Sequence, residues 1–326
     1  MISQINKPFS YLVTYSRFPT ETNIYNKDGD FVSNLQKVPL IEELPKGFMS
    51  VRTGKRSFSW RPDKGASLTY VTALDSGDPS KKVDFRDEVY ELNYPFSGKG
   101  KFILKTINRF SGIDWGTKDM AIAYDTWWNT RNRKSYVFNP SNPNIKPKII
   151  SDRNYQDTYS DPGSFLRSRN EFNRSVLKMH YGNIFLRGQG FSPSGQFPFI
   201  DKVNTKTFEK TRVYQSSYTD KIESIIDYDP KKNQLTVSIE SPSEYPNYYT
   251  KKVKSGKLEK LTNLKNPFLE LQNVKKEKIT YLRNDGVELS GILYLPLNYD
   301  KEKKEKMPMI LWAYPREFKD RQSASQ

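Results

Sequence analysis

The sequence contains no cysteine and a single histidine. The lack of cysteine excludes disulfide bonds and thiolate metal sites, and with one histidine we expect no zinc site and no other cofactor. No apolar run approaches the roughly 20 residues that a membrane-spanning helix needs, and residues 1–8 contain no signal-peptide core. We therefore expect a soluble chain without a membrane partner. The compartment stays open, a periplasmic or secreted parent protein being one alternative.

Two signatures of catalysis are also missing. The pentapeptide G-x-S-x-G, which presents a hydrolase nucleophile on a sharp turn, does not occur, and its nearest approach at residues 190–195 predicts a loop. His180 precedes every hydrolase-like strand, whereas hydrolase triads run Ser, acid, His, so we expect it to pack or hydrogen-bond within a β-structure. Glu42 and Glu43 are adjacent, and neighbouring side chains of an extended chain point apart, so they predict a solvated turn.

The charge of the chain is strongly basic. Lys and Arg total 53 against 37 Asp and Glu, a formal net charge of +16. Such an excess can attract nucleic acid. However, the lysine clusters at residues 251–252, 275–276 and 301–306 do not alternate with aromatic residues, as a base-stacking surface would require. We expect them in turns and linkers, and we expect no nucleic-acid partner.

What the sequence has in abundance favours β-structure. It contains 21 Tyr and 19 Phe, which favour strands, together with 20 Pro and 17 Gly, which favour turns. Strands are predicted at residues 9–15, 67–74 and 235–240, and the Asp28-Gly29 dipeptide predicts a hairpin. No sustained apolar spacing of three and four residues occurs, so no long helix is expected before residue 265.

A weak internal repeat supports a particular β architecture. Similar strand openings begin at Phe58, Ile113, Val176 and Ile225, which are 49 to 63 residues apart. This spacing is typical of four-stranded propeller blades. A β-sandwich with irregular loops is the alternative.

The pattern changes near residue 265. Residues 265–277 predict a linker, and residues 278–282 and 287–295 predict strands around a turn at Asp285-Gly286. Residues 309–314 (MILWAY) are continuously apolar, which predicts a strand buried on both faces, as in an α/β sheet. Three strands without a covering helix cannot bury two faces, so we expect further elements of this layer to lie beyond the sequence.

Several segments resemble one known family. They are KPFSY (residues 7–11), PLIEELP (39–45), VRTGKRSFSWR (51–61), ALDSGDP (73–79), DGVELSG (285–291) and WAYPREF (312–318). The sequence resembles the prolyl oligopeptidase family of serine peptidases, in its glutamyl endopeptidase branch. The resemblance covers nearly the whole chain, and the last two segments are its most specific motifs.

The resemblance implies a fold that is mostly β. A partial β-propeller of four to five blades would occupy residues 1–265. The linker and the first strands of an α/β-hydrolase domain would occupy residues 266–326, truncated before the nucleophile.

The resemblance also implies an activity. Its chemistry is the hydrolysis of a peptide substrate by a Ser-Asp-His triad, after Glu in this branch, with the propeller restricting access. Because the triad is absent here, we expect the chain alone to be inactive. Tyr314 is the one candidate catalytic residue, as a hydroxyl donor to the oxyanion, and a packed core tyrosine is its alternative. Arg167, Arg169 and Arg187 are candidates to face a substrate glutamate.

Two other classes of function stay open. One is a non-enzymatic propeller that binds a peptide or a glycan, for which residues 309–314 would have no use. The other is a nucleic-acid-binding β protein, which would show a steep salt dependence of binding. The peptide specificity and the oligomeric state are left open by the sequence.

Overall fold

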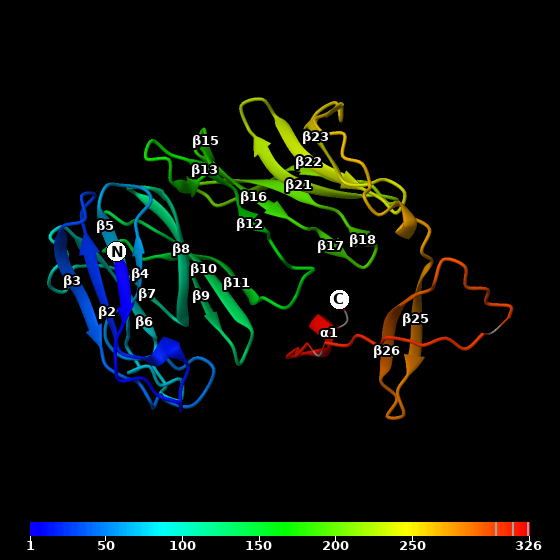
Figure 1. Cartoon of the computed structure of the whole chain (residues 1–326). Coiled ribbons are helices and arrows are strands. Elements are labelled where there is room, and N and C mark those ends of the chain that lie inside the picture. Colours follow the sequence, from blue (N-terminus) through cyan, green and yellow to red (C-terminus); the bar gives the residue numbers. More distant parts are fainter. Residues whose placement is uncertain (304, 315, 325) are drawn as a thin grey trace. The chain divides into compact units, whose positions relative to one another are not determined.

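The computed structural model describes residues 1–303, 305–314, 316–324 and 326. These residues form short β-strands in antiparallel sheets, and their one α-helix, α1 (Arg321–Ala324), has four residues (Figure 1). The chain divides into two compact units. Unit 1 comprises Met1–Pro193, Phe199–Val213 and Phe318–Gln326, and unit 2 comprises Ser194–Pro198 and Tyr214–Glu317.

Unit 1 is built from successive antiparallel sheets in which the strands follow chain order. The first sheet contains β1 (Ile2–Ile5), β2 (Thr20–Tyr25) and β3 (Phe31–Val38). The second contains β4 (Arg56–Trp60), β5 (Ser67–Ala73), β6 (Asp87–Asn93) and β7 (Lys101–Thr106). The third contains β8 (Arg109–Thr117), β9 (Met120–Trp127), β10 (Asn132–Phe138) and β11 (Lys148–Asn154).

In the fourth sheet, two short strands pair with the same neighbouring strand. It contains β12 (Ser164–Phe165), β15 (Met179–His180), β16 (Asn183–Gly188), β19 (Phe199–Asn204) and β20 (Lys210–Gln215). Both β12 and β15 pair with β16, and between them the chain forms the hairpin of β13 (Arg167–Arg169) and β14 (Ser175–Leu177). The remaining short elements of unit 1 are η1 (Tyr15–Arg17) and β17 (Phe191–Ser192), whereas β18 (Gly195–Gln196) belongs to unit 2.

The apolar cores of unit 1 lie between consecutive sheets. The core between the first and second sheets includes Ile24, Leu35, Leu68, Tyr70 and Leu92. The core between the second and third includes Val71, Val89, Leu104, Trp115 and Tyr136. The core between the third and fourth includes Ile122, Leu177, Ile184, Leu186 and Val203. A strand such as β5 has neighbours on both faces, and its first five residues are accordingly all buried.

Unit 2 contains a four-stranded sheet and a separate hairpin. The sheet is β21 (Ile222–Asp229), β22 (Gln234–Glu240), β23 (Asn247–Lys252) and β24 (Leu258–Lys260). Burial alternates along β22, as expected for a strand with one face on a core. After η2 (Leu269–Leu271), β25 (Lys276–Leu282) and β26 (Glu288–Tyr294) pair around Gly286, whose φ of +81° suits a tight turn.

The predicted fold class is confirmed in its main part. Four-stranded meanders that follow one another and pack through apolar cores are the structure of propeller blades. The strands predicted at residues 67–74 and 235–240 and the hairpin at Asp28-Gly29 are present. Three repeat openings lie on β4, β8 and β21, the first strands of their sheets, whereas the one at Val176 lies on the inserted hairpin.

Three sequence predictions are wrong. Residues 9–15 form no strand, because no neighbouring strand pairs with them, and Tyr11 and Leu12 are exposed. Lys251 and Lys252 lie not in a turn but on β23, where Lys251 is buried, and Lys276 is the first residue of β25. The described residues 309–314 form no strand and are exposed rather than buried, since no described strand pairs with them. Pro315, which belongs to the same motif, lies outside the described residues.

Candidate functional site

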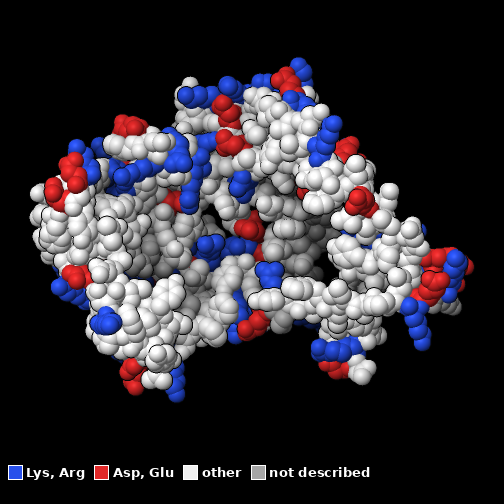
Figure 2. Space-filling view, in the orientation of Figure 1, with Lys and Arg blue, Asp and Glu red and all other residues white. Residues whose placement is uncertain are grey.

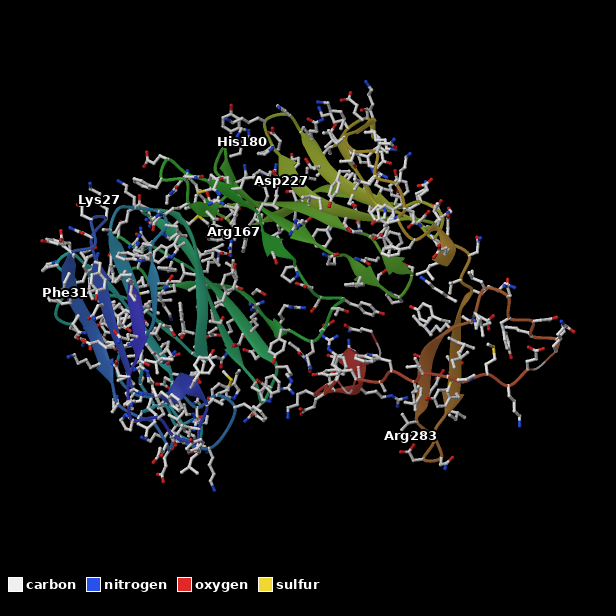
Figure 3. The ribbon with its side chains drawn as sticks, in the orientation of Figure 1. Lys27, Phe31, Arg167, His180, Asp227 and Arg283 are labelled. Carbon is white, nitrogen blue, oxygen red and sulfur yellow. The ribbon has the colours of Figure 1, made fainter. Side chains whose placement is uncertain are left out.

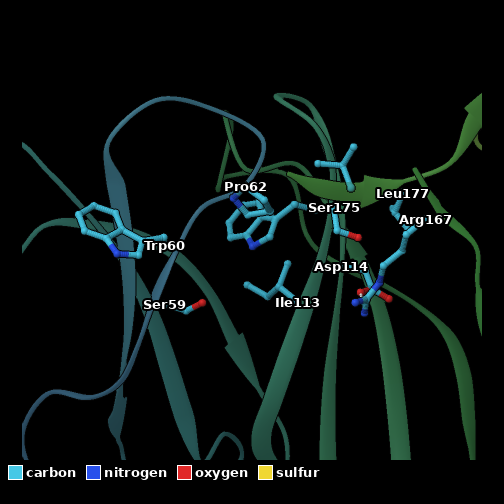
Figure 4. A pocket seen from close by; sticks show the side chains of 10 residues that line it. Ser59, Trp60, Pro62, Ile113, Asp114, Arg167, Ser175 and Leu177 are labelled. Atoms are coloured by element: carbon cyan, nitrogen blue, oxygen red, sulfur yellow. The ribbon is translucent and has the colours of Figure 1, made fainter. Parts of the chain in front are cut away.

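The candidate site is a cavity of about 170 Å³ in unit 1 (Figure 4). Its walls come from β4, β8 and the β13–β14 hairpin. The side chains that line it are those of Ser59, Trp60, Pro62, Ile113, Asp114, Trp115, Arg167, Ser175, Val176 and Leu177. Both β4 and β8 are edge strands of their sheets, so their outer sides are not covered by a further strand of the same sheet.

One wall of the cavity is stiffened by a buried arginine. The Arg61 guanidinium lies 4.1 Å from the centre of the Trp115 ring, where a cation–π contact is favourable. It donates two hydrogen bonds to Asp63, of 3.0 and 2.6 Å, and lies 3.1 Å from a carboxylate oxygen of Glu91. All three charged side chains are almost fully buried, so Trp115 packs against a neutralised and rigid group.

Another part of the cavity wall carries an ion pair between Arg167 on β13 (Figure 3) and Asp114 on β8 (Figure 4). The second carboxylate oxygen of Asp114 accepts a hydrogen bond of 2.8 Å from the Tyr124 hydroxyl. Burial, together with the adjacent Asp114 charge, raises the pKa of Tyr124, so this phenol remains a donor at neutral pH. Both carboxylate oxygens of Asp114 therefore have a partner.

Arg167 is the exposed member of this group. Its side chain is 56% exposed, against 8% for Asp114. A guanidinium has five N–H donors in a planar fork that matches a carboxylate. Part of the Arg167 fork therefore remains accessible to a further anion from solvent, while Asp114 fixes its position.

The other two arginines singled out from the sequence are placed differently. Arg169 donates a 2.9 Å hydrogen bond to the carbonyl of Asn173 across its own hairpin. Arg187 is half-buried on β16, where Ser164 of β12 pairs with it. The structure does not bring the three arginines into one pocket, since only Arg167 lines the cavity.

Tyr314 is not part of the cavity. It lies in unit 2 with 84% of its surface exposed. The alternative interpretation, that Tyr314 packs in a core, does not describe its position in this structure. His180 is partly buried on β15, and its ring centre lies 4.1 Å from that of the exposed Tyr181. Ser194 lies in a turn between two short strands, and Glu42 and Glu43 are exposed.

A metal site needs a group of ligating side chains, and a membrane-spanning helix needs a long apolar sequence. Within residues 1–303, 305–314, 316–324 and 326, no three His, Asp or Glu side chains are grouped to hold a metal ion. Over the same residues, no helix has the length and apolar character needed to cross a bilayer. Basic and acidic side chains are interspersed over the visible face (Figure 2).

Sequence reasoning missed two buried ionic clusters. In unit 1, Arg109 donates to Asp75 at 2.7 Å and to Asp87 at 3.1 Å, and both carboxylates are fully buried. In unit 2, the Lys251 ammonium lies 2.7 Å from Glu223. The partners are 22 to 34 residues apart, and no local pattern marks them.

Comparison with known proteins identifies the sequence relatives. The chain is 36% identical over 342 residues to a probable chloroplastic glutamyl endopeptidase of Oryza sativa subsp. japonica. It is 34% identical over 343 residues to the corresponding protein of Arabidopsis thaliana. The chain is similar in sequence to these two glutamyl endopeptidases. Both alignments include 100% of the chain, and the resemblance found in the sequence motifs is thereby confirmed.

The relationship has a limited span. The chain covers 36% of the length of each of these glutamyl endopeptidases. No family model matches the chain. Among solved structures, dipeptidyl peptidase 4 of Porphyromonas gingivalis matches with a TM-score of 0.42 and 13% identity, over 90% of this chain and 52% of that one. Oligopeptidase B of Trypanosoma brucei matches with a TM-score of 0.42 and 10% identity, over 76% and 39%. We base no conclusion on likenesses this weak.

Proposed function

We propose that this chain is the propeller and the beginning of the hydrolase domain of a serine-type peptidase that cleaves peptides after Glu. The observation that carries the proposal is the alignment of this whole chain with 36% of the length of two glutamyl endopeptidases. In this proposal residues 1–265 restrict access to the active site, and residues 266–326 contain the first strands of the α/β-hydrolase domain. The β25–β26 hairpin, which is not part of a blade, agrees with this division.

In the proposed assignment this chain has no catalytic nucleophile. The sequence has no G-x-S-x-G turn, and the single histidine, His180, precedes the hydrolase-like strands and so does not fit a triad in the order Ser, acid, His. The purified chain should therefore not hydrolyse a fluorogenic Glu-containing peptide. It should also not react with a fluorophosphonate probe for serine hydrolases. Labelling of this polypeptide would contradict the proposal.

Activity is expected when the chain is joined to the rest of such an enzyme. In a chimera, residues 1–326 would replace the aligned part of the Oryza sativa relative. We expect this chimera to hydrolyse peptides with Glu before the scissile bond, and not the matched Gln peptides. A folded chimera that is inactive on both peptides would overturn the peptidase assignment.

Tyr314 has a defined part in the proposal. The exposed hydroxyl would donate a hydrogen bond to the oxyanion of the tetrahedral intermediate once the active site is complete. Loss of one such donor lowers kcat by roughly 10²–10³-fold. We therefore expect Tyr314→Phe in the chimera to lower kcat on this scale with little change in KM. An unchanged kcat would remove Tyr314 from the mechanism.

Arg167 is our candidate to attract the acidic side chain of the substrate. It is the one arginine of the three that lines the cavity, and its side chain is half exposed. Arg167→Met in the chimera should raise KM for the Glu peptide while kcat changes little. Arg283→Met is a suitable control, because Arg283 forms an exposed pair with Asp285 on the β25–β26 hairpin. Equal effects of the two variants would count against Arg167.

A further inference from the structure

A turn in unit 1 holds the side chain of Gln326 through all of its polar atoms. The amide oxygen Oε1 accepts hydrogen bonds from Thr158 N at 2.6 Å, Thr158 Oγ1 at 3.1 Å and Tyr159 N at 3.2 Å. The amide nitrogen Nε2 donates to Asp157 Oδ1 at 2.8 Å. Three donors therefore meet the oxygen, and a carboxylate meets the nitrogen.

The turn is organised by contacts of its own. The Arg153 guanidinium donates to the carbonyl of Asp157, and the Ser160 N–H donates to Asp157 Oδ1 at 3.2 Å. The Asp161 N–H donates to the Thr158 carbonyl at 3.3 Å. These bonds fix the donors and the carboxylate before a ligand arrives, so little ordering is required on binding.

A second set of contacts fixes the segment that carries Gln326. Asn154 Nδ2 donates to Asp320 Oδ2 at 2.8 Å and lies 3.2 Å from Ser323 Oγ, and Ser323 is buried. The Lys319 N–H donates to Gln156 Oε1 at 3.1 Å. Asp320 also caps α1 by accepting from Ser323 N at 2.7 Å. These hydrogen bonds hold Lys319, Asp320 and Ser323 on unit 1.

We propose that residues 157–159 form a binding site for a primary carboxamide, which the side chain of Gln326 occupies in the same chain. This site goes beyond the proposed peptidase function and does not depend on it. Its chemistry selects glutamine over glutamate, because a carboxylate there would face Asp157 without a proton to share. It also selects against an apolar side chain of the same length, which would leave the donors of Thr158 without a protein partner. The site, together with the contacts of Lys319, Asp320 and Ser323, holds the segment that carries Gln326 on unit 1.

The Thr158 amide proton gives a direct measurement. It donates to Gln326, so its protection from hydrogen exchange reports occupancy of the site. Exchange is measured by NMR on the ¹⁵N-labelled full chain and expressed as a protection factor, which removes the intrinsic effect of pH. Gln326→Met should lower the protection of Thr158 about tenfold, the effect of losing roughly one to two net hydrogen bonds, at both pH 7 and pH 4.

Gln326→Glu separates amide recognition from simple packing. At pH 7 it should lower the protection factor at least as much as Gln326→Met, because two carboxylates would meet. Near pH 4, protonation of one carboxyl restores a shared hydrogen, so protection should largely return. Gln326→Glu combined with Asp157→Asn should restore protection at pH 7, because the new amide can donate to the new carboxylate. Gln4→Glu, which makes the same charge change on the exposed strand β1, should leave Thr158 unaffected.

Two results would overturn the inference. Equal protection of Thr158 in the wild type and in Gln326→Met would show that the carboxamide is not bound there. Wild-type protection in Gln326→Glu at pH 7 would show that the site does not distinguish an amide from a carboxylate. Both readings are independent of peptidase activity.

Discussion

Replacing Glu223 by Gln should destabilise the sheet of unit 2 strongly. Glu223 lies on β21 and Lys251 on β23, and their side chains are 0% and 10% exposed. Lys251 also donates a 2.6 Å hydrogen bond to the Tyr214 hydroxyl and lies 4.7 Å from the centre of the Tyr218 ring. Burial lowers the pKa of Lys251, but its hydrogen bonds to Glu223 and Tyr214 outweigh this and raise the pKa overall. Removing Glu223 therefore leaves Lys251 buried without the carboxylate that offsets the cost of its burial.

The magnitude follows from distance and burial. Two unit charges at the observed 2.7 Å attract by about 6 kcal/mol at an effective dielectric constant near 20. Part of this attraction is offset by desolvation, and the new amide can still accept a hydrogen bond. Breaking a buried pair while leaving one charge in place costs about 3–5 kcal/mol in measured cases, and we expect Glu223→Gln to fall in this range.

Unit 2 supplies a control at the same distance. Lys221 and Glu244 also lie 2.7 Å apart, but their side chains are 28% and 54% exposed. Solvent screens the attraction between these exposed charges. Glu244→Gln should therefore lower the free energy of unfolding far less than Glu223→Gln, although it removes the same charge.

The assay must report on unit 2 alone. Hydrogen exchange of the β22 and β23 amides, followed by mass spectrometry in increasing urea, gives the free energy of opening of this sheet. The double variant Glu223→Gln with Lys251→Met should recover most of the loss, because no unpaired charge then remains buried. Similar losses for Glu223→Gln and Glu244→Gln, or no recovery in the double variant, would refute the reasoning.

Three further predictions concern unit 1, each read from exchange of its core amides. A β-carbon at Gly77, whose φ is +77°, would lie 1.8 Å from the Val51 carbonyl oxygen, so Gly77→Ala should cost about 2–4 kcal/mol. Gly29→Ala, at a φ of +91° with open space around it, should cost about 1 kcal/mol, and equal costs would refute the steric argument. Burial raises the pKa of Asp125 above 3.8, so its carboxyl favours folding at low pH and this contribution is lost as pH rises through the raised pKa. The stability of Asp125→Asn relative to the wild type should therefore improve from pH 4 to pH 7, and a constant difference would contradict this. Arg109→Met should cost about 3–5 kcal/mol at pH 7, against less than about 1 kcal/mol for the exposed Lys37→Met, and equal losses would count against the buried network.

The local β-structure was predictable because it depends on short-range signals. Alternation marks β22, the Asp28-Gly29 turn joins β2 to β3, and the Asp285-Gly286 turn joins β25 to β26. Each signal depends on side-chain direction or on the φ angle of one glycine, which neighbouring residues determine. The spacing of strand openings likewise predicted blades, although the inserted β13–β14 hairpin displaced one opening.

The candidate site depends on long-range contacts that sequence spacing does not encode. Arg167 could be named as a candidate among three arginines, but its pairing with Asp114, 53 residues earlier, follows from the packing of the hairpin near β8. The prediction of a buried strand at residues 309–314 was wrong because it relied on local composition alone. Their apolar composition indicates what would stabilise them, but burial needs covering elements, and no described strand pairs with them.

The ionic clusters explain how a cavity between sheets keeps its geometry. Apolar packing between blades is non-directional, so it permits small rotations of one sheet against the next. Arg109, the first residue of β8, is held by hydrogen bonds to Asp87 on β6 and to Asp75 in the segment between β5 and β6. This anchors the strand that also carries Asp114 and Trp115, while Arg61 packs on Trp115 from the chain after β4. The position of Arg167 is thus determined by a continuous set of directional contacts, and the buried charges stabilise one arrangement of the sheets over its neighbours.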